Sequence, residues 1–315
     1  MEFADTKALV IGTGISGLSA VSLLERKGAQ VILFDANEKL KCADVKAKLK
    51  ADSRAQIVIG TLPEGLLDTV DLVIPSPGVP MDIPMMLEIR RREIPVWGEI
   101  ELGYRCGQGS IAAITGTNGK TTTTTLVGQI LKNYNPHTYV VGNIGMPYAD
   151  VADGMEPDAM TAAEISSFML ESIVEFHPKV SAILNITPDH LDRYDHCMQN
   201  YIDAKFRITQ NQTQDDAFVF WNDDPIIKRE LEKHGLKAHL YPFAAVKEDG
   251  AIAYVEDNEV KITEPIAFNM EQEKLALTGQ HNLYNSLAAG ISANLAGITK
   301  EDIRKALSDF KGVEH

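Results

Sequence analysis

Short apolar runs alternate with amphipathic stretches through the first hundred residues. Residues 7–11 and 30–34 are nearly continuous apolar runs typical of buried strands, and residues 18–27 between them carry apolar side chains at helical spacing. Residues 56–60 and 71–74 repeat the strand character. This order predicts a βαβ opening followed by further βα units, which is typical of an open, largely parallel sheet with helices on its faces.

The rest of the chain shows the same alternation, with one turn signal at residues 257–258 that predicts a β-hairpin. We expect strands at residues 95–96, 110–114, 180–184, 216–221, 238–241, 251–255 and 259–263, and helices at residues 86–92, 126–131, 201–208, 281–295 and 299–310. The predicted fold class is α/β. A length of 315 residues, above the ~250–300 at which single cores stop growing, indicates at least two domains.

Composition narrows the class of protein. Hydrophobic residues make up 44% of the chain and charged residues 23%, which is typical of globular proteins and excludes disordered and fibrous classes. The formal net charge of −14 is opposite in sign to that of a nucleic-acid binder, so we expect no nucleic-acid partner. Three widely spaced cysteines, and no apolar run near ~20 residues, predict a reduced cytoplasmic protein that does not enter a membrane.

A glycine-rich turn lies between the first predicted strand and helix. It reads G-T-G-I-S-G at residues 12–17, which permits a tight turn and lets backbone N–H groups approach a phosphate. Asp35 follows about 20 residues later, where a carboxylate can accept a ribose hydroxyl. Alone, this unit favours NAD or FAD, and the alternative is a turn that uses glycine only for packing. The proline-rich turn at residues 75–80 either faces the same ligand or is a plain connector.

A second loop changes this interpretation. T-G-T-N-G-K-T-T at residues 115–122 joins a strand to a helix, so that Lys120 can supply charge to the outer phosphates and the Thr121 hydroxyl can coordinate Mg²⁺. Ile114 stands where the common Walker pattern has its first glycine, which makes this a shorter G-x-x-G-K-T variant. A Thr-rich helix start without a nucleotide is the alternative. A dehydrogenase has no use for a second phosphate loop, whereas an enzyme that uses ATP to join a nucleotide-linked substrate to another molecule needs both.

Five blocks in order resemble the Mur ligases of peptidoglycan precursor synthesis. They lie at residues 116–122, 142–145, 164–168, 185–194 and 279–285 and extend over nearly the whole chain. Within the family, the pair of loops is most similar to the branch that adds D-glutamate to UDP-N-acetylmuramoyl-L-alanine. The L-alanine-adding branch, which typically carries His where Asn118 stands, is one alternative, and a dinucleotide-dependent oxidoreductase is an alternative from another class.

The resemblance implies a reaction in which ATP converts a carboxylate to an acyl phosphate that an amine then attacks. It implies a Rossmann-like domain at residues 1–98 for the UDP precursor and a central P-loop ATPase-type domain at residues 99–311. It assigns ATP to Gly116, Thr117, Asn118, Gly119, Lys120, Thr121, Thr122, Asn282 and Asn285. It assigns the UDP substrate to Gly14, Ile15, Ser16, Asp35, Ala36, Ser76, Pro77, Gly78, Asn143, Ser166 and His190.

The same resemblance names catalytic and metal-binding residues. Lys120 is expected to be catalytic together with Glu164, His190 and Lys205, and Mg²⁺ is expected on Thr121, Glu164, His190 and a carbamylated Lys205. Each residue also has a plain structural interpretation. Glu164 can be a helix-start acid, His190 a loop residue paired with a neighbouring aspartate, and Lys205 a solvated lysine on a helix face. Asn282 can likewise be a capping residue.

Members of the family continue beyond the position where this sequence ends. The resemblance therefore identifies residues 312–315 as the start of a linker to a third domain, which supplies part of the ATP site and most of the amino-acid site. We expect a monomer that binds the UDP precursor but does not turn over by itself, because the acyl phosphate would stay open to water.

Overall fold

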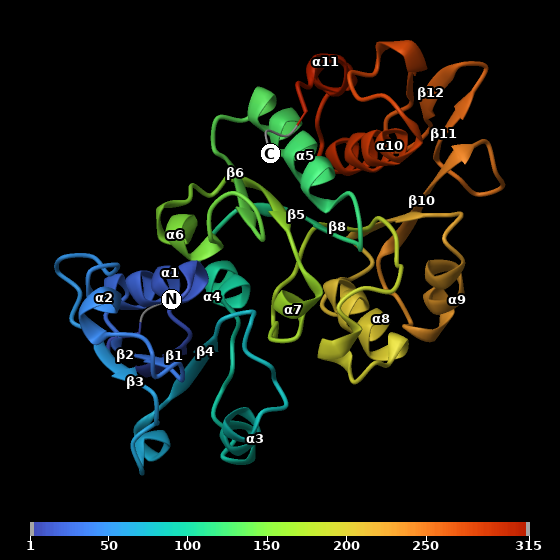
Figure 1. Ribbon diagram of the computed structural model, residues 1–315. Helices are drawn as coiled ribbons and strands as arrows, with labels where there is room; N and C mark the ends of the chain where they lie inside the picture. Colours follow the sequence, from blue (N-terminus) through green and yellow to red (C-terminus); the bar gives the residue numbers. More distant parts are fainter. Residues whose placement is uncertain (1–2, 313–315) are drawn as a thin grey trace. The chain divides into compact units, whose positions relative to one another are not determined.

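Two units make up the chain in its computed structural model, which describes residues 3–312 (Figure 1). The first unit runs up to Gly107 and also includes Met146–Met155 and Phe168–Phe176. The second contains Gln108–Gly145, Glu156–Ser167 and the described residues from His177 onward. Residues 313–315 of the predicted linker lie outside the described residues.

The first unit is built on a four-stranded parallel sheet of order β3-β2-β1-β4. The strands are β1 (Lys7–Ile11), β2 (Gln30–Asp35), β3 (Gln56–Ile59) and β4 (Leu72–Pro75), and the helices are α1 (Ile15–Arg26), α2 (Cys42–Lys46), α3 (Pro84–Arg91), α4 (Glu99–Cys106) and α6 (Tyr148–Val151). The predicted βαβ opening is confirmed. The predicted strand at residues 95–96 is reduced to one isolated bridge between Val96 and Val73, and α4 belongs to this unit although it follows the predicted boundary at residue 98.

The apolar runs of these strands form the core of the first unit. Leu9 and Ile32 are buried in the sheet and belong to one apolar cluster with Met86 and Ile89 of α3. The carboxylate of Glu101, on α4, is also fully buried and accepts backbone N–H bonds from Val174, Glu175 and Phe176 at 2.8–2.9 Å. The segment Phe168–Phe176 is thus held in the first unit by hydrogen bonds to a helix of that unit.

The second unit contains a nine-stranded sheet of order β13-β12-β11-β10-β9-β8-β5-β7-β6. Its strands are β5 (Ser110–Thr115), β6 (Thr138–Gly142), β7 (Met160–Glu164), β8 (Val180–Ile183), β9 (Ala217–Trp221), β10 (His239–Val246), β11 (Ala253–Glu256), β12 (Glu259–Ile262) and β13 (Phe268–Glu271). All neighbours from β6 to β11 pair in parallel, and β12 and β13 are antiparallel. The β11–β12 hairpin confirms the predicted turn, since Asp257 and Asn258 both have positive φ.

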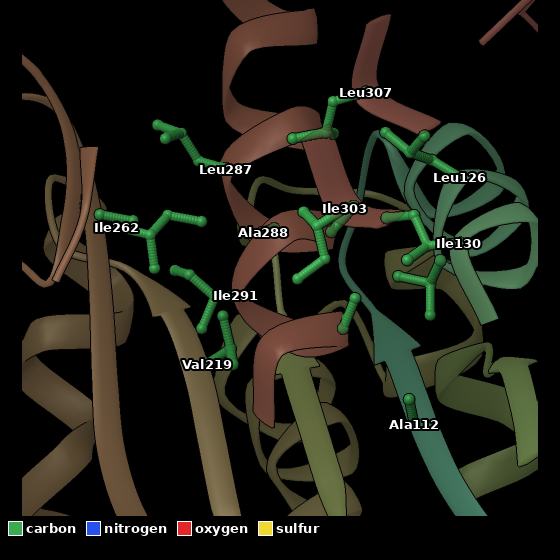
Figure 2. Packing of buried hydrophobic residues seen from close by; sticks show 14 of the residues in the cluster. Ala112, Leu126, Ile130, Val219, Ile262, Leu287, Ala288, Ile291, Ile303 and Leu307 are labelled. Carbon is green, nitrogen blue, oxygen red and sulfur yellow. The ribbon is translucent and has the colours of Figure 1, made fainter. Parts of the chain in front are cut away.

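Three helices cover one face of this sheet. They are α5 (Lys120–Tyr134), α10 (Gln280–Leu295) and α11 (Lys300–Asp309). The other α-helices that begin in this unit are α7 (Ser167–Leu170), α8 (Met198–Phe206) and α9 (Pro225–Lys233). Figure 2 shows the core, in which Ile130 of α5, Ile291 of α10 and Ile303 of α11 pack over Ala112 and Val219 of the sheet. Among the described residues, none of the helices has the length and apolar content needed to cross a bilayer.

Candidate active site

The glycine-rich turn of the first unit connects β1 to α1 and is packed so closely that Gly12 and Gly17 cannot be replaced. A Cβ on Gly17 would lie 2.0 Å from the Gly12 carbonyl oxygen, and Gly12 itself has a φ of +103°. Ser76, which follows β4, closes the turn: a Cβ on Gly12 would meet its Oγ at 2.6 Å. The Ser76 Oγ is buried without a hydrogen-bond partner among the described residues. This orphaned hydroxyl is a polar group that a ligand at the turn can satisfy.

Asp35, at the end of β2, braces the same turn. Its Oδ2 accepts hydrogen bonds from the Thr13 N–H at 3.0 Å and the Thr13 hydroxyl at 2.7 Å, and its Oδ1 accepts the Asn37 N–H at 3.0 Å. Burial opposes ionisation, but these hydrogen bonds outweigh it and lower the pKa of Asp35. A ribose hydroxyl would therefore have to share a carboxylate that already orders the turn, using its remaining lone pairs.

The other predicted UDP-binding residues of this unit lie close in the chain to these two. Gly14, Ile15, Ser16, Ala36, Pro77 and Gly78 follow the carboxyl ends of β1, β2 and β4. Because the three strands are parallel neighbours, these ends meet at one edge of the sheet. Ile15 is 75% exposed at the first position of α1, which leaves an apolar side chain at this edge.

The phosphate loop of the second unit joins β5 to α5. Gly119 has a φ of +83°, and a Cβ there would lie 2.3 Å from Asn285 Oδ1, so the position requires glycine. The first N–H groups of the 15-residue helix α5 have no partner within the helix, which makes its N-terminus an anion-binding site. The Lys120 ammonium lies over this loop and donates to the carbonyl oxygens of Gly116 at 3.0 Å and Thr117 at 2.8 Å.

A second lysine reaches the same loop from α8. Lys205 is only 2% exposed, and its Nζ donates to the Gly116 carbonyl oxygen at 2.8 Å, the oxygen that Lys120 also contacts. Burial, and after it the charge of Lys120, lower the pKa of Lys205 to about 7. Burial also lowers the pKa of Lys120, against the attraction of Glu164 and Asp189. The interpretation of Lys205 as a solvated surface lysine is therefore wrong.

Glu164 ends β7 beside the phosphate loop. It is 1% exposed, and its Oε1 accepts a hydrogen bond from Asn143 Nδ2 at 2.7 Å. Its Oε2 is buried and has no hydrogen-bond partner within residues 3–312. A buried carboxylate oxygen without a donor is costly unless a cation or water completes it, and hard cations such as Mg²⁺ prefer such oxygens. The residues present therefore fit the expected metal.

The remaining predicted residues of this unit are less constrained. His190 adopts a left-handed backbone with a φ of +50°, its side chain is 60% exposed, and its Nε2 lies 3.5 Å from Asp189 Oδ2. Ser166 follows Glu164 by two residues. Thr121 and Thr122 are half-buried in the first turn of α5, next to Lys120.

Two asparagines of α10 approach the loop from the side. Asn285 is 8% exposed, and its Oδ1 accepts the Thr123 hydroxyl at 3.3 Å and limits the space beside Gly119. Asn282 lies one turn earlier, inside α10, and its Nδ2 donates to the Thr278 carbonyl oxygen at 2.9 Å. The N-cap of α10 is Gly279, so the interpretation of Asn282 as a capping residue is wrong. Asn285 is therefore part of the packing around the phosphate loop.

The structure adds two residues to which sequence reasoning assigned no role. Tyr201 lies one helical turn before Lys205; its hydroxyl is 3.1 Å from Thr117 Oγ1 and its ring lies 4.6 Å from the Lys205 Nζ. Asn185 binds the backbone of Asn118 with both ends of its side-chain amide. The spacing of Tyr201 and Lys205 on one helix was a readable signal, whereas the contact of Asn185 joins segments 67 residues apart.

Comparisons with known proteins agree with this arrangement. A family model described as Mur ligase middle domain matches residues 114–293, and one described as Mur ligase MurD-like, N-terminal domain matches residues 6–98. The UDP-N-acetylmuramoylalanine–D-glutamate ligase of Bacteroides thetaiotaomicron is 58% identical over 313 residues, which cover 98% of this chain and 69% of that protein. The protein of the same name from Bacteroides fragilis is 55% identical with the same coverage.

Solved structures support the fold. A UDP-N-acetylmuramate:L-alanyl-gamma-D-glutamyl-meso-diaminopimelate ligase from Neisseria meningitides superimposes with a TM-score of 0.63 at 15% identity, over 98% of this chain and 99% of that one.

Proposed function

The chain belongs to the Mur ligase family, whose members use ATP and Mg²⁺, and we propose that it adds D-glutamate to UDP-N-acetylmuramoyl-L-alanine. One observation carries the proposal. The chain has a glycine turn with an orphaned Ser76 hydroxyl in one unit and a separate lysine-bearing phosphate loop in the other. An oxidoreductase would need only the first. The names of the two Bacteroides relatives support D-glutamate as the added amino acid.

The proposed reaction has two steps. A carboxylate oxygen of the precursor attacks the γ-phosphorus of ATP, and the bond to ADP breaks to give an acyl phosphate. The amine of D-glutamate then attacks the acyl carbon, loses a proton and displaces phosphate. When bound, Mg²⁺ neutralises charge on the transferred group. Lys120 would leave the loop carbonyls and supply a fixed positive charge to the phosphates.

We assign the UDP part of the precursor to residues of the first unit and ATP to residues of the second. The UDP part of the precursor is proposed to lie at the turn of Gly14, Ile15 and Ser16, with Asp35, Ala36, Ser76, Pro77 and Gly78 around it. ATP is proposed to lie on residues 116–122 with Asn282 and Asn285. Asn143, Ser166 and His190 are proposed to meet the reacting end of the precursor, and Mg²⁺ to bind Thr121, Glu164 and His190. The proposed domains are residues 1–98 and 99–311, although α4 (Glu99–Cys106) belongs to the first unit.

Lys205 is proposed to carry a carbamate that completes the metal site. A neutral amine can attack CO₂ and release a proton, which leaves an anionic carbamate on Nζ. Two ammonium groups now share the Gly116 carbonyl oxygen, so the modification would replace a repulsion with an attraction to Lys120. Tyr201, which stacks under the amine, would shield it from water.

¹³C NMR under ¹³CO₂ tests the carbamate directly. The chain should show one carbamate resonance at pH 7.5 that strengthens when Mg²⁺ is added. Lys205→Arg, which keeps the positive charge but cannot form the adduct, should lack it. A spectrum that is the same for both proteins would disprove the assignment.

Calorimetry tests the substrate class. We expect the chain to bind UDP-N-acetylmuramoyl-L-alanine, to bind ATP in an EDTA-sensitive manner, and to ignore NAD⁺. UDP-N-acetylmuramate is the control for the L-alanine-adding branch, whose substrate lacks the alanine. Binding of NAD⁺ in place of the precursor, or preference for the alanine-free compound, would overturn the proposal.

We also propose that the protein works as a cytoplasmic monomer. None of the three described cysteines forms a disulfide, which suits a reducing compartment. Sedimentation equilibrium at micromolar concentration should give a mass near 34.6 kDa, and a mass twice as large would contradict the monomer.

A further inference from the structure

Asn185 lies where β8 stops pairing with β5. The last ladder pair is Thr115 and Ile183, and one backbone bond follows beyond it: the Thr117 N–H donates to the Asn185 carbonyl oxygen at 2.9 Å. The next N–H along, that of Ile186, turns away and donates to the buried carboxylate of Asp224 at 2.8 Å. The backbone after Asn185 therefore cannot supply the next rung of the ladder to the phosphate loop.

The side chain of Asn185 supplies that rung instead. Its Oδ1 accepts the Asn118 N–H at 2.9 Å, and its Nδ2 donates to the Asn118 carbonyl oxygen at 3.0 Å. A primary amide offers the same donor and acceptor as a peptide group, so the two bonds fix Asn118 as a neighbouring strand would. Both backbone groups of the residue at the tip of the loop are thus held.

This contact also fixes the direction of the next N–H group. In a trans peptide the C=O and the following N–H point in opposite directions across the plane. Because the Asn118 carbonyl oxygen points at Asn185, the Gly119 N–H must point away from Asn185. Gly119 has a φ of +83° and no side chain, so without this restraint the Asn118–Gly119 peptide could flip at little steric cost. A flipped peptide would turn a carbonyl oxygen, in place of an N–H, toward a bound anion.

We propose that Asn185 is a positioning residue that aims the Gly119 N–H at the phosphates of the nucleotide. The inference rests on the proposed function, because it requires ATP on this loop. Asn185 does not need to touch the nucleotide, since its bonds go to the backbone of Asn118.

Two variants and one observable test this role. Asn118-Gly119 is the one Asn-Gly pair in the sequence, so ¹³C′-asparagine with ¹⁵N-glycine labelling gives a single resonance for the Gly119 amide. In the unmodified chain this resonance should move downfield when Mg-ATP saturates the site, as expected for an N–H that donates to phosphate. Asn185→Leu should bind Mg-ATP about 10- to 100-fold more weakly, the loss expected for two hydrogen bonds, and its Gly119 resonance should not move downfield at saturation.

Asn294→Leu is the matched control. Asn294 is 2% exposed in the same unit, and its Nδ2 donates to the carbonyl oxygens of Glu264 at 3.4 Å and Ile266 at 2.9 Å. The control variant likewise loses two side-chain hydrogen bonds to the backbone and should be less stable, but its nucleotide affinity and Gly119 shift should stay unchanged. Should Asn185→Leu fail to fold, Asn185→Asp keeps an acceptor for the Asn118 N–H but replaces the donor to the Asn118 carbonyl oxygen with a charged oxygen that repels it, and should also abolish the shift.

The outcomes distinguish the positioning role of Asn185 from the proposed function. A downfield shift of Gly119 in the saturated Asn185 variants, equal to that of the unmodified chain, would overturn the positioning role. Failure of the unmodified chain to bind Mg-ATP would instead refute the proposed function, and the inference with it.

Discussion

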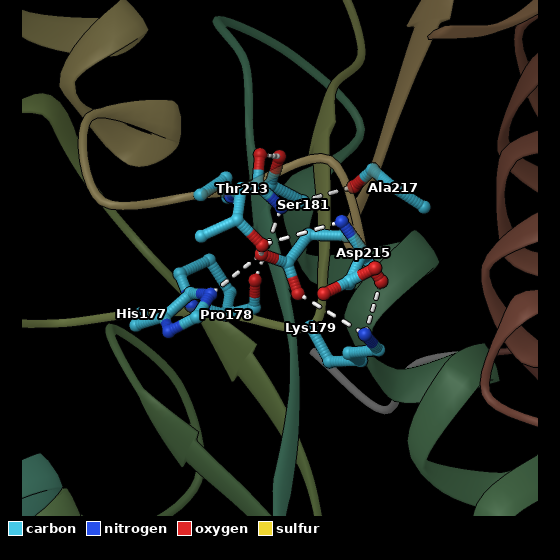
Figure 3. Close-up of polar contacts among 9 residues, drawn as sticks. His177, Pro178, Lys179, Ser181, Thr213, Asp215 and Ala217 are labelled. Carbon is cyan, nitrogen blue, oxygen red and sulfur yellow. Dashed lines mark hydrogen bonds and ion pairs between the residues drawn. The ribbon is translucent and has the colours of Figure 1, made fainter. Parts of the chain in front are cut away.

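Asp216 lies at the amino ends of β8 and β9, and its replacement by asparagine tests how much one buried carboxylate stabilises the second unit. Figure 3 labels its partners His177, Lys179 and Thr213. The Asp216 side chain is 2% exposed. Oδ2 shares a hydrogen bond with His177 Nε2 at 2.6 Å and accepts the N–H and hydroxyl of Thr213 at 2.7 and 2.9 Å. Oδ1 accepts Lys179 Nζ at 3.3 Å. Asparagine would present an N–H₂ group to partners that are themselves donors.

The pKa of Asp216 gives the magnitude. Burial raises it, but the hydrogen bonds from His177, Thr213 and Lys179 outweigh burial and lower the pKa to about 2 from an ordinary 3.8. At about 1.4 kcal/mol per unit, the shift corresponds to about 2 kcal/mol of stability at pH 7. Because the folded pKa is the lower one, the unfolded chain binds more protons on acidification. The contribution is complete above the unfolded pKa and falls to about half near pH 3.

Urea denaturation measures this contribution. The chain has two tryptophans, so a Trp97→Phe background leaves Trp221, at the end of β9, as the reporter. At pH 7, Asp216→Asn should lower the free energy of unfolding by about 2–4 kcal/mol. At pH 3, the difference in this free energy between the variant and the unmodified chain should be smaller by about 1 kcal/mol. Asp215→Asn removes the same charge from an exposed neighbour and should cost less than about 0.5 kcal/mol. A difference in free energy of unfolding below about 0.5 kcal/mol at pH 7, or one that does not change with pH, would refute the stabilising role of the Asp216 carboxylate.

Three further substitutions probe the two loops and the first unit. Gly17→Ala should abolish binding of the UDP precursor and lower the free energy of unfolding by about 1–3 kcal/mol, because the new Cβ would meet the Gly12 carbonyl oxygen. Gly14→Ala is the stability control in thermal denaturation, because a Cβ there meets nothing within 4 Å. Lys120→Met should weaken Mg-ATP binding at least about 10-fold in calorimetry without loss of thermal stability, because it removes a charged contact to phosphate and relieves a partly buried ammonium. Glu101→Gln should destabilise the first unit by about 2–4 kcal/mol, because an amide cannot accept the three backbone N–H bonds and the Arg105 bond together. Urea denaturation followed by Trp97 fluorescence measures this loss, and unchanged stability would contradict the prediction.

The sequence predicted the parallel core well because local patterns specify it. Continuous apolar runs marked the strands that are buried on both faces, and the Asp257-Asn258 turn marked the one confirmed hairpin. The pattern predicted no strand at β6, β7 or β13. Strand β7 reads M-T-A-A-E, a composition with little β-preference. It nevertheless lies between β5 and β6, where α5 packs closely on the sheet: a Cβ on Gly128 of α5 would lie 2.3 Å from Val140 Cγ2 of β6.

The site shows the same division between local and distant information. Each loop could be read from its own residues, because glycine spacing and a lysine are local signals. The state of Lys205 could not, since the same amphipathic helix suits a solvated lysine and a buried one. What decides between them is the Gly116 carbonyl oxygen, 89 residues away in sequence, at which a second ammonium already lies. Two cations on one buried oxygen make a poor structural element, because each disfavours the charge of the other. The arrangement would gain a physical reason if phosphate bound at Lys120 and the proposed carbamate formed at Lys205, because each anion would offset the charge of its lysine.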